Sequence, residues 1–421
     1  MHHTPQRVAV VGAGMVGLST AWYLQERGVD VTVVERTRVA AGSSWGNAGW
    51  LTPALTVPLP EPAALRYGVR AVGRPSSPVY VPVRSNPRLL RFLAGFARHS
   101  TARRWGLGMR AYAPMNRRAL AAFDELGEGG VESATRAADP FLACFRSVDD
   151  RAAIVEELDH IRHAGQDVKY DLLTGPEARA IEPSLSAAVA GAVRLHDQRY
   201  IDPPAFLAAL AASFTARGGL LVEGATVDRV SETSRGAYVT TREPMDGASG
   251  YDHVVLANGA WVGALARQFG VRRTVQAGRG YSFSVSGDQV PRMPVYFPTQ
   301  RVACTPISGA DGPRLRVAGM MEFRSPDAAL DPRRIEAIVE ATRPLLSGVD
   351  LDDRRDEWVG SRPCTADGLP LIGRTNAPAV SVAGGHGMWG VALGPLTGKL
   401  LAHQIATGVA PPELVAFDPL R

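Results

Sequence analysis

Three glycines near the amino terminus, and an acidic residue that follows them, have the types and spacing of a nucleotide-binding turn. Gly12 permits a tight turn, Gly14 lets the backbone approach a diphosphate, and Gly17 allows a helix to pack closely on a strand. The turn follows the apolar run 7–11 and opens a helix-like stretch. Glu35 ends a second apolar run, where its carboxylate can bind a ribose hydroxyl. The pattern predicts a dinucleotide site and leaves NAD and FAD open.

A small polar loop behind the second apolar run narrows the choice of nucleotide. Residues 42–49 read Gly-Ser-Ser-Trp-Gly-Asn-Ala-Gly, and Gly42, Ser43 and Ser44 offer amides and hydroxyls without bulk, as an anion requires. Composition alone would make this an ordinary surface loop. A NAD-binding domain would continue with further strands and helices after Glu35, so the position of the loop favours FAD.

Two polar side chains near the carboxyl end could act on a substrate. Arg362 lies in a turn-rich stretch between two strand-like segments, where its planar, permanently charged fork can grip a carboxylate. From the sequence alone, an ion pair of Arg362 with Asp367 or Asp356 is the simpler interpretation. His386 stands between two glycines, either in contact with flavin or substrate or as a turn residue.

The motifs resemble those of a known enzyme family. Residues 42–49 are similar to the second FAD motif of flavoproteins of the D-amino-acid oxidase and glycine oxidase type. Residues 361–373 resemble the segment of that family that carries a substrate-binding arginine, and residues 384–390 resemble its terminal flavin loop. The resemblance covers most of the chain. It is looser between residues 53 and 125, where the chain is more similar to the D-amino-acid dehydrogenases than to the oxidases.

The resemblance implies a reaction in which the α-hydrogen of an amino acid passes as hydride to flavin N5 and the imine hydrolyses to a 2-oxo acid and ammonia. Arg362 would hold the carboxylate, with Tyr281 and His386 as further catalytic candidates, although Tyr281 could simply fill a sheet. We expect a D-amino-acid dehydrogenase that passes electrons to a quinone or another carrier. The alternatives are an oxygen-using oxidase of glycine, sarcosine or a D-proline-type amine, and the flavin subunit of a multiprotein electron-transfer complex.

The motifs and the resemblance together define the expected FAD contacts. These residues are Gly12, Ala13, Gly14, Met15, Val16, Gly17, Glu35, Arg36, Gly42, Ser43, Ser44, Asn47, Ala48, Gly49, Val227, Ala257, Asn258, Gly259, Gly385, His386, Gly387 and Met388. Some family members tether FAD through a histidine directly after the loop tryptophan, but this chain has Gly46 there, so we expect non-covalent FAD. Cys304 is a weaker candidate for a tether. No metal is needed for the reaction.

The elements that position these residues are expected to interleave two domains. The fold class is mixed α/β and α+β, with a Rossmann-like FAD-binding domain formed by residues 1–52, 191–270 and 356–421. A substrate domain, built on an antiparallel sheet with helices, takes residues 53–190 and 271–355. Helical patterns cover residues 115–126, 150–164, 203–217, 332–346 and 391–407, and strand patterns cover 220–223, 225–230, 237–241, 276–285, 314–323 and 379–384. Residues 251–261 have the pattern of a buried strand that ends in a glycine turn.

Length and composition agree with one two-domain enzyme. The chain has 421 residues, of which 45% are hydrophobic and 21% charged, so it can bury a large core. Its three cysteines lack CxxC spacing, which argues against a disulfide framework or a zinc site. We see no apolar signal region, and no stretch approaches the roughly 18 apolar residues of a spanning helix. We therefore expect a cytoplasmic protein.

An arginine-rich segment suggests that the cytoplasmic protein also contacts a membrane surface. The net charge of +5 is carried almost entirely by arginine and gives no argument for nucleic-acid binding. Residues 62–123 contain twelve arginines and no acid, interleaved with apolar side chains such as Leu89, Phe92, Trp105 and Met109. This composition suggests a peripheral contact with the inner face of the cytoplasmic membrane, near a quinone pool. The alternative is a solvated arginine-rich helical face.

Overall fold

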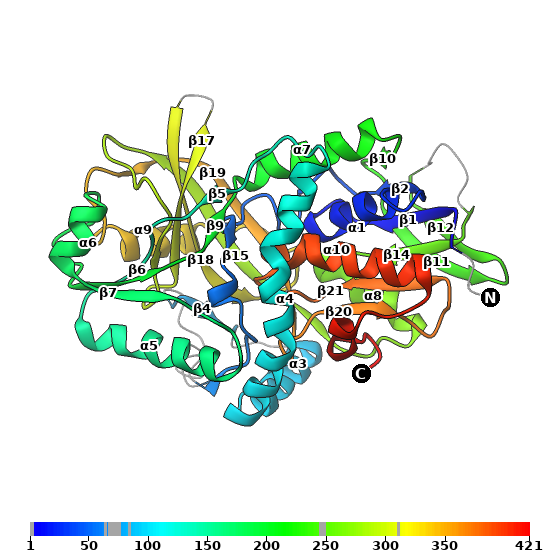
Figure 1. The fold of residues 1–421 in the computed structure, drawn as a ribbon, viewed down its shortest axis with the longest axis horizontal. Helices are drawn as coiled ribbons and strands as arrows, with labels where there is room; N and C mark the ends of the chain where they lie inside the picture. Colours follow the sequence, from blue (N-terminus) through cyan, green and yellow to red (C-terminus); the bar gives the residue numbers. More distant parts are fainter. Residues whose placement is uncertain (1–3, 63–64, 66–76, 83–85, 244–249, 310–311) are drawn as a thin grey trace.

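The structure, a computed structural model, describes all residues except 1–3, 63–64, 66–76, 83–85, 244–249 and 310–311. Its fold is mixed α/β, with two large sheets side by side in two lobes (Figure 1). The first strand and the last long helix lie in the same lobe, so the chain enters the second lobe and returns. Segments from both ends of the chain therefore lie in the first lobe.

A six-stranded sheet forms the first lobe. Its order is β10-β2-β1-β14-β21-β20, and all neighbours are parallel except β20 and β21. The parallel strands are short apolar runs because helices and a smaller sheet cover both of their faces. The strands are β1 (Arg7–Val11), β2 (Asp30–Val34), β10 (Leu220–Val222), β14 (His253–Leu256), β20 (Leu371–Arg374) and β21 (Val380–Gly384).

Two buried clusters cover the faces of this sheet. One face packs on helices, whose bounds are α1 (Met15–Gln25), α7 (Pro203–Ala216) and α10 (Gly390–Thr407). The other packs on a small sheet and one short helix, β11 (Val227–Thr233), β12 (Gly236–Thr241), β13 (Gly250–Tyr251) and α8 (Val262–Ala266). Since β1 lies between β2 and β14, the carboxyl ends of these strands border a crevice suited to a nucleotide.

A nine-stranded sheet forms the second lobe. Its main path is β19-β15-β18-β17-β16-β6-β8-β7, with β4 beside β18. The long strands β15, β17, β18 and β19 are antiparallel neighbours. The strands are β4 (Val79–Tyr80), β6 (Phe141–Phe145), β7 (Tyr170–Thr174), β8 (Gly191–Leu195), β15 (Val275–Ser286), β16 (Val295–Phe297), β17 (Val302–Gly309), β18 (Gly312–Phe323) and β19 (Asp350–Thr365).

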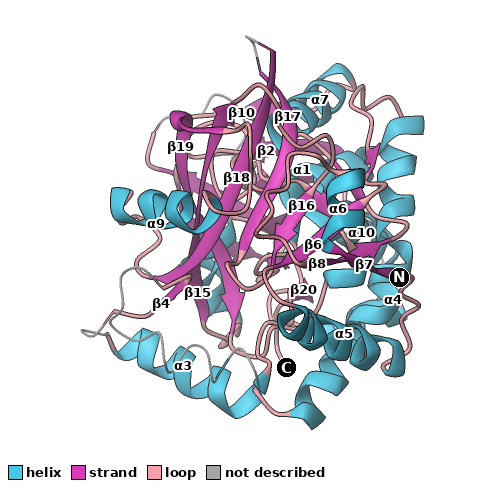
Figure 2. Cartoon of the chain, turned by 90° about the vertical axis from the view of Figure 1, so that its left-hand side faces the viewer, coloured by secondary structure: helices cyan, strands magenta, loops and turns pink. Residues whose placement is uncertain are grey.

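Helices and a second small sheet surround the nine-stranded sheet. Helix α9 lies against β15 and β18 on one face, where Ile335, Ile338 and Val339 enter the core (Figure 2). The helices are α3 (Pro87–His99), α4 (Ala102–Glu128), α5 (Val148–His163), α6 (Gly175–Ile181) and α9 (Pro332–Thr342). The small sheet is β3 (Trp50–Leu51), β9 (Arg199–Tyr200) and β5 (Arg136–Ala137).

The chain crosses between the lobes at points that differ from the expected boundaries. Strand β8, within the segment 191–270 expected in the FAD domain, belongs to the nine-stranded sheet. Strand β19 also belongs to that sheet and runs past residue 356 to Thr365. Helix α4 lies within the segment 53–190 expected in the substrate domain, but its side chains Tyr112, Met115 and Phe123 pack in the core of the first lobe. Strand pairing and packing between distant residues set these boundaries.

The arginine-rich segment is mostly helical where the structure describes it. Leu89, Phe92, Trp105 and Met109 point into the protein rather than outward. Part of the segment, residues 63–64, 66–76 and 83–85, lies outside the described residues. Among the described residues, no helix has the length and apolar character needed to span a membrane.

Candidate cofactor and substrate site

The turn between β1 and α1 has the backbone that the glycine pattern requires. Gly12 has a φ of +110°, and a Cβ atom there would lie 2.7 Å from the carbonyl oxygen of Ala257, the residue directly after β14. A Cβ atom at Gly17 would overlap the carbonyl oxygen of Gly12. Both positions therefore need glycine. Gly14 faces the Ser44 hydroxyl, so the turn is open toward the polar loop.

Two side chains complete this end of the site. Glu35 follows β2, and its carboxylate accepts hydrogen bonds from the Ala13 amide at 2.9 Å and the Thr37 amide at 3.1 Å. The Ser44 hydroxyl accepts from the Met15 amide at 3.2 Å, in the first turn of α1. The loop thus folds back over the helix N-terminus, where amides and the helix dipole favour an anion.

A cavity of about 680 Å³ runs from this turn to Arg362. It is lined by most of the expected cofactor residues: Gly12, Gly14, Met15, Val16, Glu35, Arg36, Gly42, Ser43, Ser44, Asn47, Val227, Ala257, Asn258, Gly259, His386, Gly387 and Met388. The structure therefore brings residues from the two ends of the chain to one site.

Five expected cofactor residues do not line the cavity. Gly17 packs against Gly12, and Ala13 holds Glu35 through its amide. The Ala48 carbonyl accepts from the Thr305 hydroxyl at 2.8 Å. The last two, Gly49 and Gly385, have φ values of +77° and +75° and allow tight turns against Ile201 and Leu371.

Several lining residues were not predicted from the sequence. The Arg36 guanidinium stacks over the Trp261 ring, 3.7 Å from its centroid, and the indole N–H of Trp261 donates to Asp327 at 3.0 Å. Trp261 follows the strand-to-turn segment at Ala257, which is the one signal that could have found it. The other unpredicted lining residues include Thr37, Arg38, Thr226, Asp228, Arg242, Ser361, Pro363 and Val391.

Arg362 projects from β19 at the far end of the cavity. It is half-buried, and its Nη1 donates to the Met320 carbonyl at 2.9 Å. Neither carboxylate that the sequence offered as a partner is bound to it. Asp367 is bound by Arg421 at 3.0 Å, and Asp356 accepts from the Ser284 hydroxyl at 2.8 Å. Among the residues described, no carboxylate lies within ion-pair distance of Arg362.

The uncompensated charge of Arg362 has a physical consequence. Desolvation by the surrounding protein lowers the pKa of Arg362 from its ordinary value. A desolvated charge is costly unless it is paired. An anionic ligand in the cavity would supply the missing partner, so the geometry suits a carboxylate.

Tyr281 is not at the site. Its side chain is fully buried, and its hydroxyl donates to Glu322 at 2.6 Å. Its neighbour Gly280 faces Arg362, because a Cβ atom at 280 would overlap the guanidinium, and side chains alternate along a strand. Tyr281 therefore points to the opposite face of the sheet and does not line the cavity. The structure corrects the expectation that it contacts substrate.

His386 lies where the loop 384–390 meets the strand that carries Arg362. Its side chain is buried, and its Nε2 lies 3.0 Å from the Thr397 hydroxyl. Burial lowers the pKa of His386 to about 3, so the imidazole is neutral near pH 7. The Gly387 amide donates to the Pro363 carbonyl at 2.8 Å and ties this loop to the strand of Arg362. Helix α10 then begins at Gly390 and presents its N-terminus to the cavity.

The three cysteines are buried and form no disulfide. Burial raises the pKa of the Cys364 thiol to about 12, and it raises the pKa of the Cys304 thiol as well. Cys304 belongs to the core behind the nine-stranded sheet and does not line the cavity. A tether to flavin through Cys304 is therefore inconsistent with the structure.

The residues present fit an FAD molecule. Gly12 and Gly14 form a cradle that side chains would fill, and Glu35 stands where a ribose hydroxyl is bound. The side-chain amide oxygen Oδ1 of Asn258, a residue that lines the same cavity, is buried and has no hydrogen-bond partner among the described residues. A family model described as FAD dependent oxidoreductase matches residues 7–404. The chain belongs to the FAD-dependent oxidoreductase family.

Comparisons with known proteins agree with this membership, and FAD is the cofactor of the family. A D-amino acid dehydrogenase of Cereibacter sphaeroides is 30% identical to this oxidoreductase, over 98% of this chain and 94% of the relative. Glycine oxidase of Geobacillus kaustophilus has a similar fold, with a TM-score of 0.73, 23% identity, and coverage of 100% and 99%. Glycine oxidase of Bacillus cereus has a TM-score of 0.70, 22% identity and 96% coverage of both chains.

Proposed function

We propose that this oxidoreductase converts D-amino acids to 2-oxo acids and ammonia and passes the electrons to a quinone or another carrier. The observation that carries the proposal is the Arg362 guanidinium, which faces the cavity without a carboxylate partner among the described residues. The 30% identity with a D-amino acid dehydrogenase over nearly the whole chain supports the same substrate class.

Bound FAD would supply the two-electron acceptor for oxidation of the amino acid. The chain's own residues would bind FAD and the substrate and orient them relative to one another. The glycine turn, Ser44 and the N-terminus of α1 would hold the diphosphate, and Glu35 the ribose. Arg362 would bind the substrate carboxylate and fix its orientation. Gly280 has no side chain, which leaves space for the guanidinium. Such fixed orientation is the main contribution that a protein can make to this chemistry.

Proton handling at the site follows from the same residues. His386 is neutral and its Nε2 is occupied by Thr397, so we assign it no role as a proton donor. The substrate amine must lose its proton before its lone pair can assist loss of the α-hydrogen. We therefore expect kcat/KM to rise with pH above neutrality. The midpoint of the rise should lie at the apparent pKa of the substrate amine.

The deciding experiment is anaerobic bleaching of the holoenzyme against D-amino acids, L-amino acids, glycine and N-methyl amines, followed by readmission of air. Bleaching by D-amino acids and slow recolouring in air are expected. Selective bleaching by glycine or sarcosine with rapid recolouring would make the protein an oxidase instead. A failure to reduce a dye without added partners would favour the flavin subunit of a larger electron-transfer complex.

An Arg362→Ala variant tests the carboxylate site itself. Loss of hydrogen bonds to a charged group should weaken substrate binding by roughly 10- to 100-fold, with FAD content unchanged. Arg235→Ala, an exposed arginine in the β11–β12 turn, is the matched control and should bind substrate normally. Unchanged substrate affinity in Arg362→Ala would refute the assignment.

For the electron acceptor, we propose that α3 and the start of α4 contact an anionic membrane surface. Arg91, Arg98, Arg103 and Arg110 are exposed and have no ion-pair partner within the described part of the chain. Large apolar side chains nearby are also exposed, with 56% of Leu90 and 50% of Leu107 accessible. Basic and apolar side chains together favour binding to anionic lipid.

Co-sedimentation with vesicles tests this contact. Holoenzyme should bind vesicles containing phosphatidylglycerol at low salt and dissociate from them at high salt. It should not bind neutral phosphatidylcholine vesicles. An Arg91→Glu/Arg98→Glu variant should lose binding and keep its activity with a soluble dye. Equal sedimentation of this variant and the unmodified protein would contradict the proposal.

A further inference from the structure

The strand next to Arg362 contains a bulge. Strands β15 and β18 pair Arg279 with Glu322 and Tyr281 with Gly319, so two residues of β18, Met320 and Met321, lie opposite Gly280. Met320 has a φ of +67°, a left-handed conformation that is uncommon for any residue but glycine. A bulge of this kind re-aims the groups beside it. Here the Met320 carbonyl is the group that accepts from Arg362.

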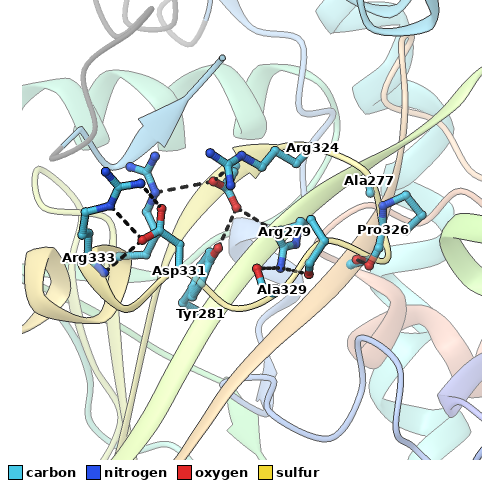
Figure 3. A network of polar contacts seen from close by, with 12 residues as sticks. Ala277, Arg279, Tyr281, Arg324, Pro326, Ala329, Asp331 and Arg333 are labelled. Carbon is cyan, nitrogen blue, oxygen red and sulfur yellow. Dashed lines mark hydrogen bonds and ion pairs between the residues drawn. The ribbon is translucent and has the colours of Figure 1, made fainter. Parts of the chain in front are cut away.

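One carboxylate spans the bulge on the opposite face of the sheet. Glu322 Oε2 accepts from Arg279 Nη1 at 3.0 Å and from the Tyr281 hydroxyl at 2.6 Å. These two donors flank Gly280 on β15, on either side of the register shift. Figure 3 shows Arg279 and Tyr281 pointing to the same side of their strand, within one polar network.

The network around Glu322 is deeply buried. Side-chain exposure is 0% for Glu322 and 1% for Arg279 and Arg334. Glu322 Oε1 also lies 3.2 Å from Arg324 Nε and 3.6 Å from Arg334 Nε. Arg279 Nη2 donates to the Ala328 and Ala329 carbonyls at 2.6 and 2.9 Å, which anchors the network to the loop before α9. Buried charges held this way are rigid, because any displacement leaves a charge unpaired.

We propose that Glu322, through Arg279 and Tyr281, is a positioning residue for Arg362. Its bonds on both sides of Gly280 hold the bulge, the bulge keeps Met320 left-handed, and the Met320 carbonyl fixes one arm of the guanidinium. The second arm is then presented to the substrate carboxylate. The inference rests on the proposed role of Arg362 and adds a residue on the far face of the sheet that never touches substrate.

The test measures affinity for propionate, the carboxylate of alanine without its amine, by perturbation of flavin absorbance in the holoenzyme. Tyr281→Phe removes one bond to Glu322 and keeps the ring, and Glu322→Gln removes the charge at nearly constant shape. Each should weaken propionate binding about tenfold, as loss of a hydrogen bond to a charged group does, and raise KM more than it lowers kcat. Propanamide, which is neutral, should bind each variant and the unmodified enzyme alike.

Tyr23→Phe is the matched control. It also removes a tyrosine hydroxyl that bonds to a glutamate, Glu125 at 3.3 Å, but in α1, far from the bulge. It should leave propionate affinity unchanged. If Glu322→Gln does not fold with FAD, Tyr281→Phe alone decides the outcome.

Combination with Arg362→Ala distinguishes the role of Glu322 from that of Arg362 itself. If Glu322 acts through Arg362, adding Tyr281→Phe to Arg362→Ala should cause no further loss of propionate affinity. Unchanged affinity in Tyr281→Phe, or additive losses in the double variant, would overturn the inference while leaving the role of Arg362 intact. Unchanged affinity in Arg362→Ala alone would overturn the proposed function and the inference together.

Discussion

Gly280 and Arg362 occupy the same face of neighbouring strands, and the guanidinium of Arg362 fills the space where a side chain at position 280 would stand. The glycine is thus part of the proposed carboxylate site without offering any functional group. This relationship explains why a residue with poor strand propensity lies in the middle of β15, since glycine in a strand often marks the close approach of another group.

Gly280→Ala should displace Arg362 and weaken carboxylate binding. We expect KM to rise by roughly tenfold or more, which corresponds to about 1.4 kcal/mol or more, while FAD content stays constant. Steady-state kinetics with the preferred amino acid measure this change. Gly106→Ala, in α4 with open space around the added methyl group, should leave KM unaltered.

Glu35→Ala should weaken the hold on FAD. The carboxylate accepts from the Ala13 and Thr37 amides, at 2.9 and 3.1 Å, and Glu35 lines the cavity where we propose that the ribose binds. Loss of a charged acceptor should cost about 1.5–3 kcal/mol of FAD binding. Flavin fluorescence released on dilution reports the affinity. Glu132→Ala, at an exposed position, should retain FAD, and equal retention by both variants would contradict the assignment.

Stability should depend on the protonation of His386. Burial holds its pKa at about 3, whereas an unfolded histidine titrates near 6.5. Between these values the unfolded state binds more protons, so the stabilisation is complete above pH 6.5 and is lost as the pH falls toward 3. At pH 5 the loss should be about 2 kcal/mol relative to pH 8.

A His386→Gln variant should lack this part of the acid destabilisation. Denaturant unfolding of both proteins at pH 5 and pH 8 measures it, with His163→Gln, at an exposed position, as the control. The same drop between the two pH values in His386→Gln as in the unmodified protein would show that His386 is not the group responsible.

Flavin should be released by acid, because position 46 cannot carry a tether. A Cβ atom at Gly46 would overlap the Trp358 ring and lie 2.8 Å from the Ser282 hydroxyl. After trichloroacetic acid precipitation, the yellow colour should remain in the supernatant, and a yellow pellet would reveal a covalent link. Gly46→Ala should also destabilise the fold by roughly 1–3 kcal/mol through overpacking, unlike Gly127→Ala in an open part of α4.

Local patterns in the sequence were enough to predict the nucleotide end of the site. The turn of Gly12, Gly14 and Gly17 and the strand that ends at Glu35 are contiguous, and their backbone chemistry is dictated by residue type. The helices α5 and α10 and the strands β15, β18 and β21 also lie close to their expected ranges, because hydrophobic periodicity is a local signal.

Only the tertiary structure decided the partners and faces of individual side chains. The sequence allowed an ion pair between Arg362 and Asp367, but Asp367 instead forms its ion pair with Arg421. Tyr281 faces away from the cavity because faces alternate along a strand, and a single shift in register or direction exchanges them. Of the apolar side chains of α3 that suggested an outward surface, Phe92 is buried against β18, whereas Leu90 is exposed.

By itself, then, the sequence determined a glycine-rich nucleotide turn, the succession of helices and strands, and an arginine in a motif suited to a carboxylate. The structure decided which charges are paired, which side chains reach the cavity, and where the chain crosses between its two sheets. The physical reason is range: turn and helix preferences depend on neighbouring residues, whereas ion pairing, strand register and burial depend on groups that are hundreds of residues apart along the chain.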